Sequence, residues 1–355
     1  MSADGFLYVM NLYDRTIYRI HIPSDSTQRP GRADVERFPV PANGCKGGDC
    51  RPFAVKVYQG RVYIGATGDA SLSGKSSDLK AIVYELDTES RGFKQVFSVP
   101  LDYSRESGPG KLNDYRWNAW TDDFSKALHP DHPSLAFYPQ PMLSSIAFDS
   151  DGSMILGLMD RFGHLSGVGQ PDPTGRIAVS GIAAGDLIRV ARQDFQSLSG
   201  KSYKLESNGT AGKLATSGRG NRQGEFYFED GFYEKEQGKI RRVVHEETGS
   251  GGLALLRSTG EVLSAAHEPG AAFNNGGIRS YNGISGRHSR SWDFFENGQS
   301  GTFGKANGVG GIEVIEQGAG ISLGSRVWLD INENGIQDIG EPGLGNIAVE
   351  LWNNG

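Results

Sequence analysis

A strand–turn–strand pattern that recurs along the chain constrains the fold most. Segments 52–69, 144–161 and 251–269 each hold an apolar strand, a turn ending in glycine and a second strand that ends in polar residues. Glycine suits such a turn because tight hairpins need positive φ. Each hairpin precedes further strand candidates, at 81–100, 185–195 and 276–286. The three turns are Gln59-Gly60, Asp151-Gly152 and Thr259-Gly260.

Four-stranded units that repeat in this way, arranged radially, form a β-propeller. Segment 5–23 looks like a partial unit, and segment 309–316 looks like one more first strand. A closed propeller has at least four such units. The sequence therefore predicts an all-β, propeller-like domain over residues 1–317, which is either incomplete, with the missing part upstream, or an intact small propeller.

Residues 330–341, DINENGIQDIGE, have the spacing of a calcium-binding loop. Side-chain oxygens at loop positions 1, 3, 5, 9 and 12 and a carbonyl at position 7 can converge on one hard cation, and Gly335 at position 6 permits the sharp turn. The alternative is a surface turn rich in Gly, Asn and Asp that matches by chance. The predicted Ca²⁺ ligands are Asp330, Asn332, Asn334, Ile336, Asp338 and Glu341.

The segments that flank this loop read as strands. Residues 325–329 and 346–352 alternate and are rich in β-branched and aromatic residues, and Pro342 disfavours a helix after the loop. The run GSRVWLDINENGIQDIGEPGLGNIAVELW resembles the opening of an SdrD B-like domain, a calcium-stabilised, Ig/prealbumin-like (Cna-B type) β-sandwich of bacterial surface proteins. The resemblance implies that residues 318–355 form only the first strands of such a module, because a whole one needs about 100 residues.

Much of the preceding chain also resembles such proteins. Runs such as RPFAVKVYQGRVYIG and PQPMLSSIAFDSDGSMILGLMDRFG are similar to the propeller that precedes SdrD B-like modules in uncharacterised bacterial surface proteins. We therefore expect a bacterial surface protein of which this chain is a fragment truncated at both ends. The resemblance implies architecture and location, but no established activity.

Composition narrows the function classes. The net charge is −6 and there is no basic block, which argues against a nucleic-acid partner. No apolar run approaches the roughly 20 residues of a membrane span. The first residues lack the features of a signal peptide, which we presume lies upstream. Cys45 and Cys50 either form a small disulfide, consistent with an extracellular or cell-surface location, or remain reduced.

A segment rich in tryptophan and aspartate, NDYRWNAWTDDF at 113–124, is a candidate ligand site. Flat aromatic rings beside carboxylates suit a sugar, whose C–H face stacks while its hydroxyls find acceptors. The alternative, which we favour, is a loop folded over one end of the propeller with its tryptophans as plugs. The candidate ligand residues are Tyr115, Trp117, Trp120, Asp122 and Asp123.

A second set of polar residues follows the predicted second strands, where side chains would approach a central channel. Asp160, Arg161 and His164 occur in MDRFGH, and His267 holds the matching position in a later unit. Such residues could perform acid–base chemistry. Structural use, for example an Asp160–Arg161 ion pair, is the favoured alternative.

The sequence thus predicts an adhesin-like role: binding of a glycan, matrix or cell-surface ligand by the propeller, with a calcium-stabilised stalk. The alternative is a propeller enzyme acting on carbohydrate, such as a lyase, a lactonase or a quinone-dependent dehydrogenase. Convergence of the four candidate catalytic residues on one pocket would favour the enzyme.

Overall fold

The computed structural model describes residues 5–25, 27–103, 105, 116–129, 131–193, 202–216, 225–236, 239–270, 275–295, 309–315, 327–328 and 343–344. The described elements are almost all strands, arranged in mainly antiparallel sheets of which none closes on itself. The prediction of an all-β chain is therefore confirmed.

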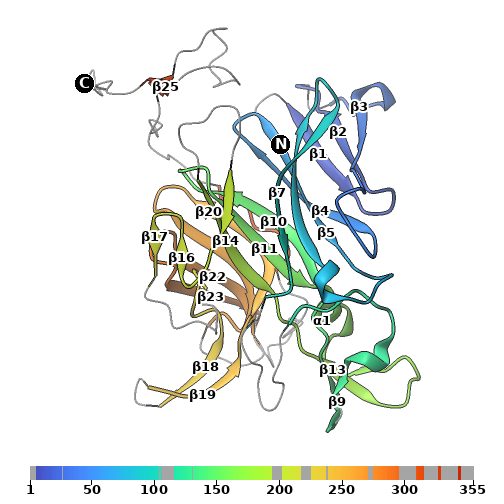
Figure 1. Ribbon diagram of the computed structural model, residues 1–355, viewed down its shortest axis with the longest axis vertical. Coiled ribbons are helices and arrows are strands. Elements are labelled where there is room, and N and C mark those ends of the chain that lie inside the picture. The colour runs from blue at the N-terminus through green and yellow to red at the C-terminus, as the bar shows by residue number, and fades with distance from the viewer. Residues whose placement is uncertain are drawn as a thin grey trace.

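Three four-stranded sheets follow one another along the chain, each with its strands in sequence order (Figure 1). The first holds β4 (Cys50–Tyr58), β5 (Arg61–Gly68), β6 (Lys80–Asp87) and β7 (Gly92–Pro100). The second holds β10 (Pro141–Phe148), β11 (Met154–Asp160), β14 (Asp186–Arg192) and β15 (Tyr203–Leu205). The third holds β20 (Gly249–Leu256), β21 (Glu261–His267), β22 (Gly276–Asn282) and β23 (His288–Phe295).

A three-stranded sheet precedes them, and shorter elements fill the connections. That sheet holds β1 (Phe6–Asn11), β2 (Thr16–His21) and β3 (Val35–Pro39). A small sheet in the order β12-β13-β9-β8 holds β8 (Leu128–His129), β9 (His132–Ala136), β12 (Gln170–Pro171) and β13 (Ala178–Gly181). Two-stranded pairs are β16 (Thr210–Ala211) with β17 (Leu214–Ala215), β18 (Phe232–Glu236) with β19 (Lys239–His245), and β24 (Val327–Trp328) with β25 (Gly343–Leu344). The described helices are α1 (Arg161–Ser166), η1 (Arg32–Asp34), η2 (Ser76–Asp78) and η3 (Phe124–Ala127).

The predicted hairpins are confirmed, and one predicted strand is wrong. β4–β5, β10–β11 and β20–β21 are antiparallel hairpins whose turn glycines Gly60, Gly152 and Gly260 have φ of 69°, 76° and 71°. Segment 309–315 is irregular rather than a strand. There Gly310 has a φ of 76°, which interrupts an extended run.

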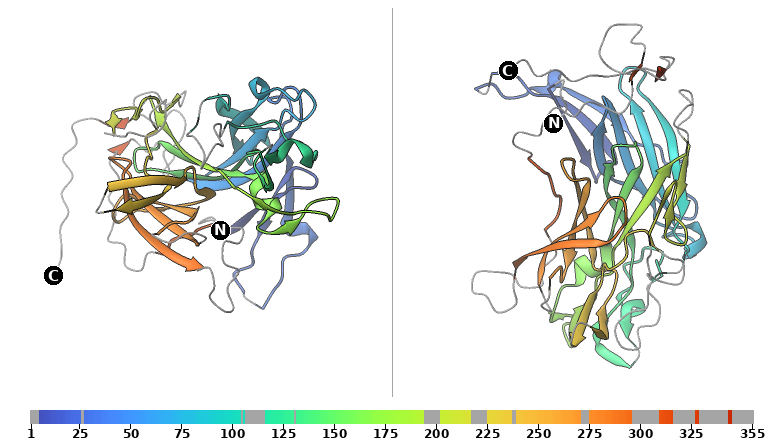
Figure 2. Two further views of the ribbon diagram at one scale, coloured as in Figure 1. Left: turned by 90° about the horizontal axis from the view of Figure 1, so that it is seen from below. Right: turned by 90° about the vertical axis from the view of Figure 1, so that its left-hand side faces the viewer.

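The four sheets lie side by side, with their first strands next to one another. β10 packs against both β4 and β20, and β1 packs against β4. Figure 2 shows the same succession from two other sides, from the blue β1–β3 sheet to the orange β20–β23 sheet. Because the first strands of successive sheets are neighbours, the ends of equivalent strands collect at the same end of the assembly.

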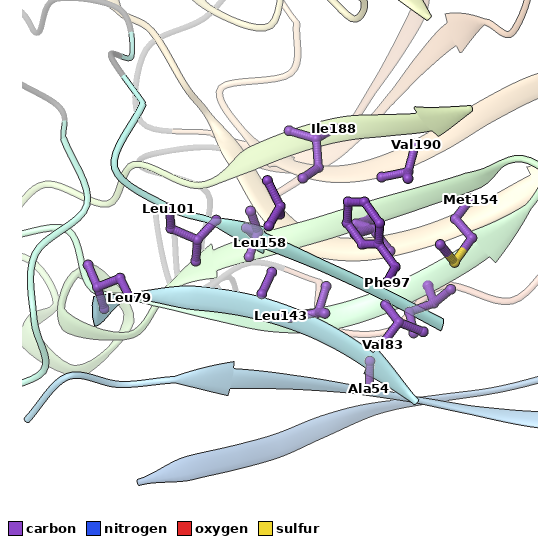
Figure 3. Packing of buried hydrophobic residues seen from close by; sticks show 14 of the residues in the cluster. Ala54, Leu79, Val83, Phe97, Leu101, Leu143, Met154, Leu158, Ile188 and Val190 are labelled. Atoms are coloured by element: carbon purple, nitrogen blue, oxygen red, sulfur yellow. The ribbon is translucent and has the colours of Figure 1, made fainter. Parts of the chain in front are cut away.

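Apolar side chains fill the space between neighbouring sheets, so the inner sheets are buried on both faces. Successive strand residues point to opposite faces, and almost every residue of β5 and β11 is buried, which explains their nearly continuous apolar sequences. The largest cluster lies between the β4–β7 and β10–β15 sheets and includes Ala54, Val83, Phe97, Leu143, Met154, Leu158, Ile188 and Val190 (Figure 3).

Among the described residues, no helix has the length and hydropathy needed to cross a bilayer.

Candidate functional site

The segment 116–127 crosses the ends of two sheets and is fixed there by backbone hydrogen bonds. The Trp120 amide donates to the carbonyl of Asp69, just after β5, at 2.9 Å. The Asn118 amide donates to the carbonyl of Pro139, just before β10, at 2.8 Å. Residues 116–124 of the predicted ligand segment are thus tied to the strand ends rather than forming a free loop.

The structure separates the predicted aromatic ligands. Trp117 is fully buried, with the Arg105 guanidinium 3.7 Å from its ring centroid, so it acts as a plug and is closed to a ligand. Trp120 is half-buried, and its indole N–H donates to the carbonyl of Pro141 at 2.8 Å. Tyr115 lies outside the described residues.

A surface pocket of about 150 Å³ opens where this segment meets α1. α1 begins at the residue that follows β11, so the wall of the pocket that α1 forms is anchored to a core strand. The pocket combines aromatic rings with a cation, a carboxylate and an amide, which is the usual make-up of a small-molecule site. Its principal lining residues are Asp122, Phe124, Tyr138, Gln140, Arg161 and Phe162.

Arg161 is held in the pocket by two side-chain hydrogen bonds. Its Nη1 donates to Gln140 Oε1 at 2.6 Å, and its Nη2 donates to Asp122 Oδ1 at 2.8 Å. Its guanidinium also lies 4.9 Å from the centroid of the Trp120 ring. The Arg161 side chain is 24% exposed and that of Asp122 is 93% exposed. Gln140 is fully buried and donates to the carbonyl of Thr121 at 3.1 Å, so it holds Arg161 in place.

Asp123, also predicted as a ligand residue, caps η3 at the rim of the pocket. It accepts hydrogen bonds from the Ser125 amide at 3.1 Å and the Ser125 hydroxyl at 2.6 Å, which hold the pKa of the Asp123 carboxyl below its usual value. Burial raises the pKa of the neighbouring Tyr138 phenol, and the charge of Asp123 adds to this effect. Asp123 therefore has a structural role at the rim, where it holds the start of η3.

Asp160 points away from the pocket and is fully buried. Its Oδ1 accepts from the amides of Gln140 at 2.9 Å and Phe162 at 3.0 Å, and its Oδ2 accepts from the amide of Ala184 at 3.2 Å. Burial raises the pKa of Asp160 to about 7, although the backbone amides of Gln140, Gly163 and Ala184 and the Arg105 charge oppose the rise. The carboxyl thus joins three chain segments.

Asp160 and Arg161 diverge because adjacent residues at the end of a strand point to opposite sides. The suggested Asp160–Arg161 ion pair is wrong, since Arg161 pairs with Asp122. Asp69 at the end of β5 matches Asp160, because it is fully buried and accepts from the Asp49 amide at 2.8 Å. Buried carboxylates at equivalent strand ends therefore have a structural part in two successive sheets.

The remaining two catalytic candidates meet each other. The rings of His164 in α1 and His267 in β21 lie 5.4 Å apart between centroids, and His267 is 4% exposed. Neither lines the pocket, and nor does Asp160, so the four candidates do not share one pocket within the described part of the chain.

A buried charge cluster that no sequence pattern predicted joins three sheets. The Arg105 side chain is fully buried, and its Nη2 donates to the carbonyls of Ala184 at 3.1 Å and Gly185 at 2.7 Å and to Glu247 Oε2 at 2.8 Å. Asp186 lies 3.7 Å from Arg105 Nε. The contributing residues are far apart in the sequence, so no sequence motif predicts this cluster.

Carboxylates outnumber the arginine in this cluster. Oxygens of Asp186, Glu225 and Glu247 lie within 4.8 Å of one another, and Arg105 neutralises part of their charge. Glu247 has a φ of 56°, a conformation that costs a non-glycine residue roughly 1–2 kcal/mol. Its bond to the Arg105 guanidinium helps to hold that conformation.

A second buried pair lies nearby. His245 Nδ1 is 3.0 Å from Glu268 Oε2, and His245 Nε2 is 2.8 Å from the carbonyl of Ala183. Both nitrogens of the ring face oxygens, so the ring is held on both sides. Glu268 is also fully buried, with a φ of 52°.

The remaining predicted sites lie at the start of β4 and near the C-terminus. Cys45 and Cys50 form a disulfide, with a Cα–Cα distance of 5.5 Å. The predicted calcium ligands lie outside the described residues, as does segment 346–352. The flanking strands β24 and β25 are described and pair antiparallel, with Val327 opposite Leu344 and Trp328 opposite Gly343.

Comparison with known proteins changes the assignment of the chain. No protein-family model matches it. The chain is 30% identical to Colossin-C of Dictyostelium discoideum over 97% of its own length, and it spans 32% of that protein. It is 30% identical to Colossin-A and 24% identical to Colossin-B of the same organism, of which it spans 3% and 9%.

The resemblance to a bacterial surface protein is wrong. The similar proteins are eukaryotic, and the similarity runs along nearly the whole chain. Short runs of turn and strand residues do not distinguish bacterial from eukaryotic relatives, because glycine-rich hairpins and Asp/Asn-rich loops recur wherever β-strands are joined tightly. The chain spans a third or less of the length of these relatives.

Proposed function

We propose that this chain is a binding domain that holds a saccharide in the pocket between segment 116–127 and α1. The observation that carries the proposal is the pairing of aromatic rings with a fixed polar set: Phe124, Tyr138 and Phe162 beside Gln140 and Arg161. A pyranose can place its C–H face on the ring of Phe124 or Tyr138 while a hydroxyl bonds to the Arg161 guanidinium, which buried Gln140 holds in place.

The arrangement of the sheets supports a propeller as the architecture that presents this pocket. The first strands β1, β4, β10 and β20 are neighbours in sequence order, as consecutive blades would be. In that architecture the pocket lies at the blade end where β11 passes into α1. Rigid strand ends suit a binding site because they position side chains accurately.

We favour binding over carbohydrate chemistry, which was the alternative. The carboxyl of Asp160 is bonded to three backbone amides. Of the four candidate catalytic residues, Arg161 lines the pocket, whereas Asp160, His164 and His267 do not. A glycan of a matrix or a cell surface is the proposed ligand class. The disulfide of Cys45 and Cys50 supports an extracellular location, because such bonds persist in oxidising compartments.

The test of saccharide binding is a glycan array on the full chain, followed by calorimetry with the best binder. Replacing Tyr138 by alanine should weaken binding about tenfold or more, because the stacking ring is lost, whereas Tyr138→Phe should bind nearly as well as the wild type. Tyr13→Ala is the matched control, since that ring is 97% exposed in the turn between β1 and β2, outside the pocket. An array without any bound saccharide, or full affinity in Tyr138→Ala, would contradict the proposal.

We also propose that residues 330–341 bind Ca²⁺ in a structural role. All six donors offer oxygen, which calcium prefers. The pairing of β24 with β25 brings the two ends of the intervening loop together, as a chelating loop requires. A bound ion would neutralise carboxylates that otherwise repel one another.

For the calcium loop we expect a dissociation constant of roughly 0.1–1 mM, the range of extracellular modules. Calcium should slow proteolysis near the C-terminus, and Glu341→Gln should weaken binding at least tenfold, because it removes the bidentate ligand. Glu313→Gln, outside the loop, is the control. Equal calcium affinity in wild type and Glu341→Gln would show that the loop is not the site.

A further inference from the structure

We infer that the saccharide is acidic, and that its carboxylate replaces Asp122 on Arg161. The inference rests on the proposed function, because it specifies the ligand of the same pocket. In the free protein Asp122 occupies the position that the carboxylate of the ligand would take.

The Arg161 guanidinium is pre-organised from the protein side. Buried Gln140 accepts from Nη1 at 2.6 Å, and the Trp120 ring lies 4.9 Å from the guanidinium carbon. A ligand therefore meets a planar donor whose orientation is already set, so little side-chain freedom is lost on binding. Fixed guanidinium groups bind carboxylates more strongly and more specifically than neutral groups.

Asp122 is a replaceable partner. Its side chain is 93% exposed, and the ion pair with Arg161 has its carboxylate in water. Exposed pairs of this kind contribute little to stability. A ligand that also stacks on the aromatic wall can therefore displace Asp122 at small cost. The short 2.8 Å contact shows that a carboxylate fits at this position.

Arg161 is the one cation among the described residues that line the pocket. Arg51 lies 5.6 Å from the Trp120 ring centroid, but it is paired with Asp69 at 2.8 Å and with Asp49 at 2.9 Å. Asp123 is negative, but its hydrogen bonds turn it toward Ser125 in η3.

The aromatic wall favours an acidic sugar over other carboxylates. Tyr138 and Phe124 are half-buried, and they provide flat apolar surface within the same pocket as Arg161. A uronate or sialate residue combines a C–H face with a carboxylate on one ring, and so can use both features.

The test measures the affinity of the full chain for uronate- and sialate-bearing glycans and for the same glycans after reduction of the carboxyl to an alcohol. Wild type should bind the best acidic glycan at least tenfold more tightly than its reduced form. Asp122→Asn should raise the affinity for the acidic glycan about three- to tenfold, because the Asp122 carboxylate no longer competes for Arg161. The affinity for the reduced glycan should stay unchanged. Arg161→Met should abolish the preference, and Arg161→Lys should keep only part of it.

The outcomes separate the two proposals. Equal affinity for acidic and reduced glycans would overturn the acidic-ligand inference and leave saccharide binding intact. Weaker acidic binding in Asp122→Asn would also overturn it, because Asp122 would then be a ligand contact. Failure to bind any glycan of the panel or of the wider array would contradict both saccharide binding and the acidic-ligand inference. Melting temperatures of all variants show whether a loss reflects unfolding.

Discussion

Replacing Arg105 by methionine is expected to lower the free energy of unfolding by about 3–5 kcal/mol. The guanidinium is fully buried and bonds to the carbonyls of Ala184 and Gly185 and to Glu247. Methionine fills a similar volume but leaves the carboxylates of Glu247 and Asp186 without their cation. Urea denaturation of the full chain, followed by intrinsic fluorescence, measures the change.

Two further variants show whether charge is the cause. Arg37→Met, with a side chain 63% exposed, should change the free energy of unfolding by less than about 1 kcal/mol. Combining Arg105→Met with Glu247→Gln should cost less than the sum of the single changes, because one uncompensated charge is then removed. Strictly additive effects would mean that Arg105 acts through packing on Trp117 rather than through this ion pair.

Stability is also expected to fall as the pH rises from about 4 to about 7, because of Asp160. Burial raises the pKa of this carboxyl from 3.8 to about 7. In this window the unfolded chain has released the proton and the folded chain retains it. The contribution is therefore fully present below about pH 4 and lost by about pH 7, with a size on the order of a few kcal/mol.

Asp160→Asn isolates this contribution from those of other groups. The amide keeps the size of the carboxyl and can still accept from Gln140 and Phe162, but it does not titrate. The variant should lose stability at low pH and show a flatter pH dependence between about pH 4 and 7, measured by urea denaturation at each pH. The same slope in wild type and variant would show that Asp160 is ionised throughout this range in the folded protein.

Local sequence predicted the hairpins correctly because their causes are local. Gly60, Gly152 and Gly260 occupy turns that need positive φ, and the apolar runs on either side form the paired strands. The same reasoning failed for 309–316, where Gly310 interrupts the run. Its extension to a bacterial relative failed as well, since similar turns and loops arise in unrelated β proteins.

The sequence by itself determined that the chain is all-β and where its three principal hairpins lie, because turn chemistry and apolar alternation act between near neighbours. Only the tertiary structure decided the use of each polar and aromatic residue. Trp117 became a plug and Trp120 a support for Arg161, while Asp160 and Arg161 turned to opposite sides of one strand end. Such roles depend on which sheets pack together, and burial and charge pairing between distant segments leave no pattern in the order of residues.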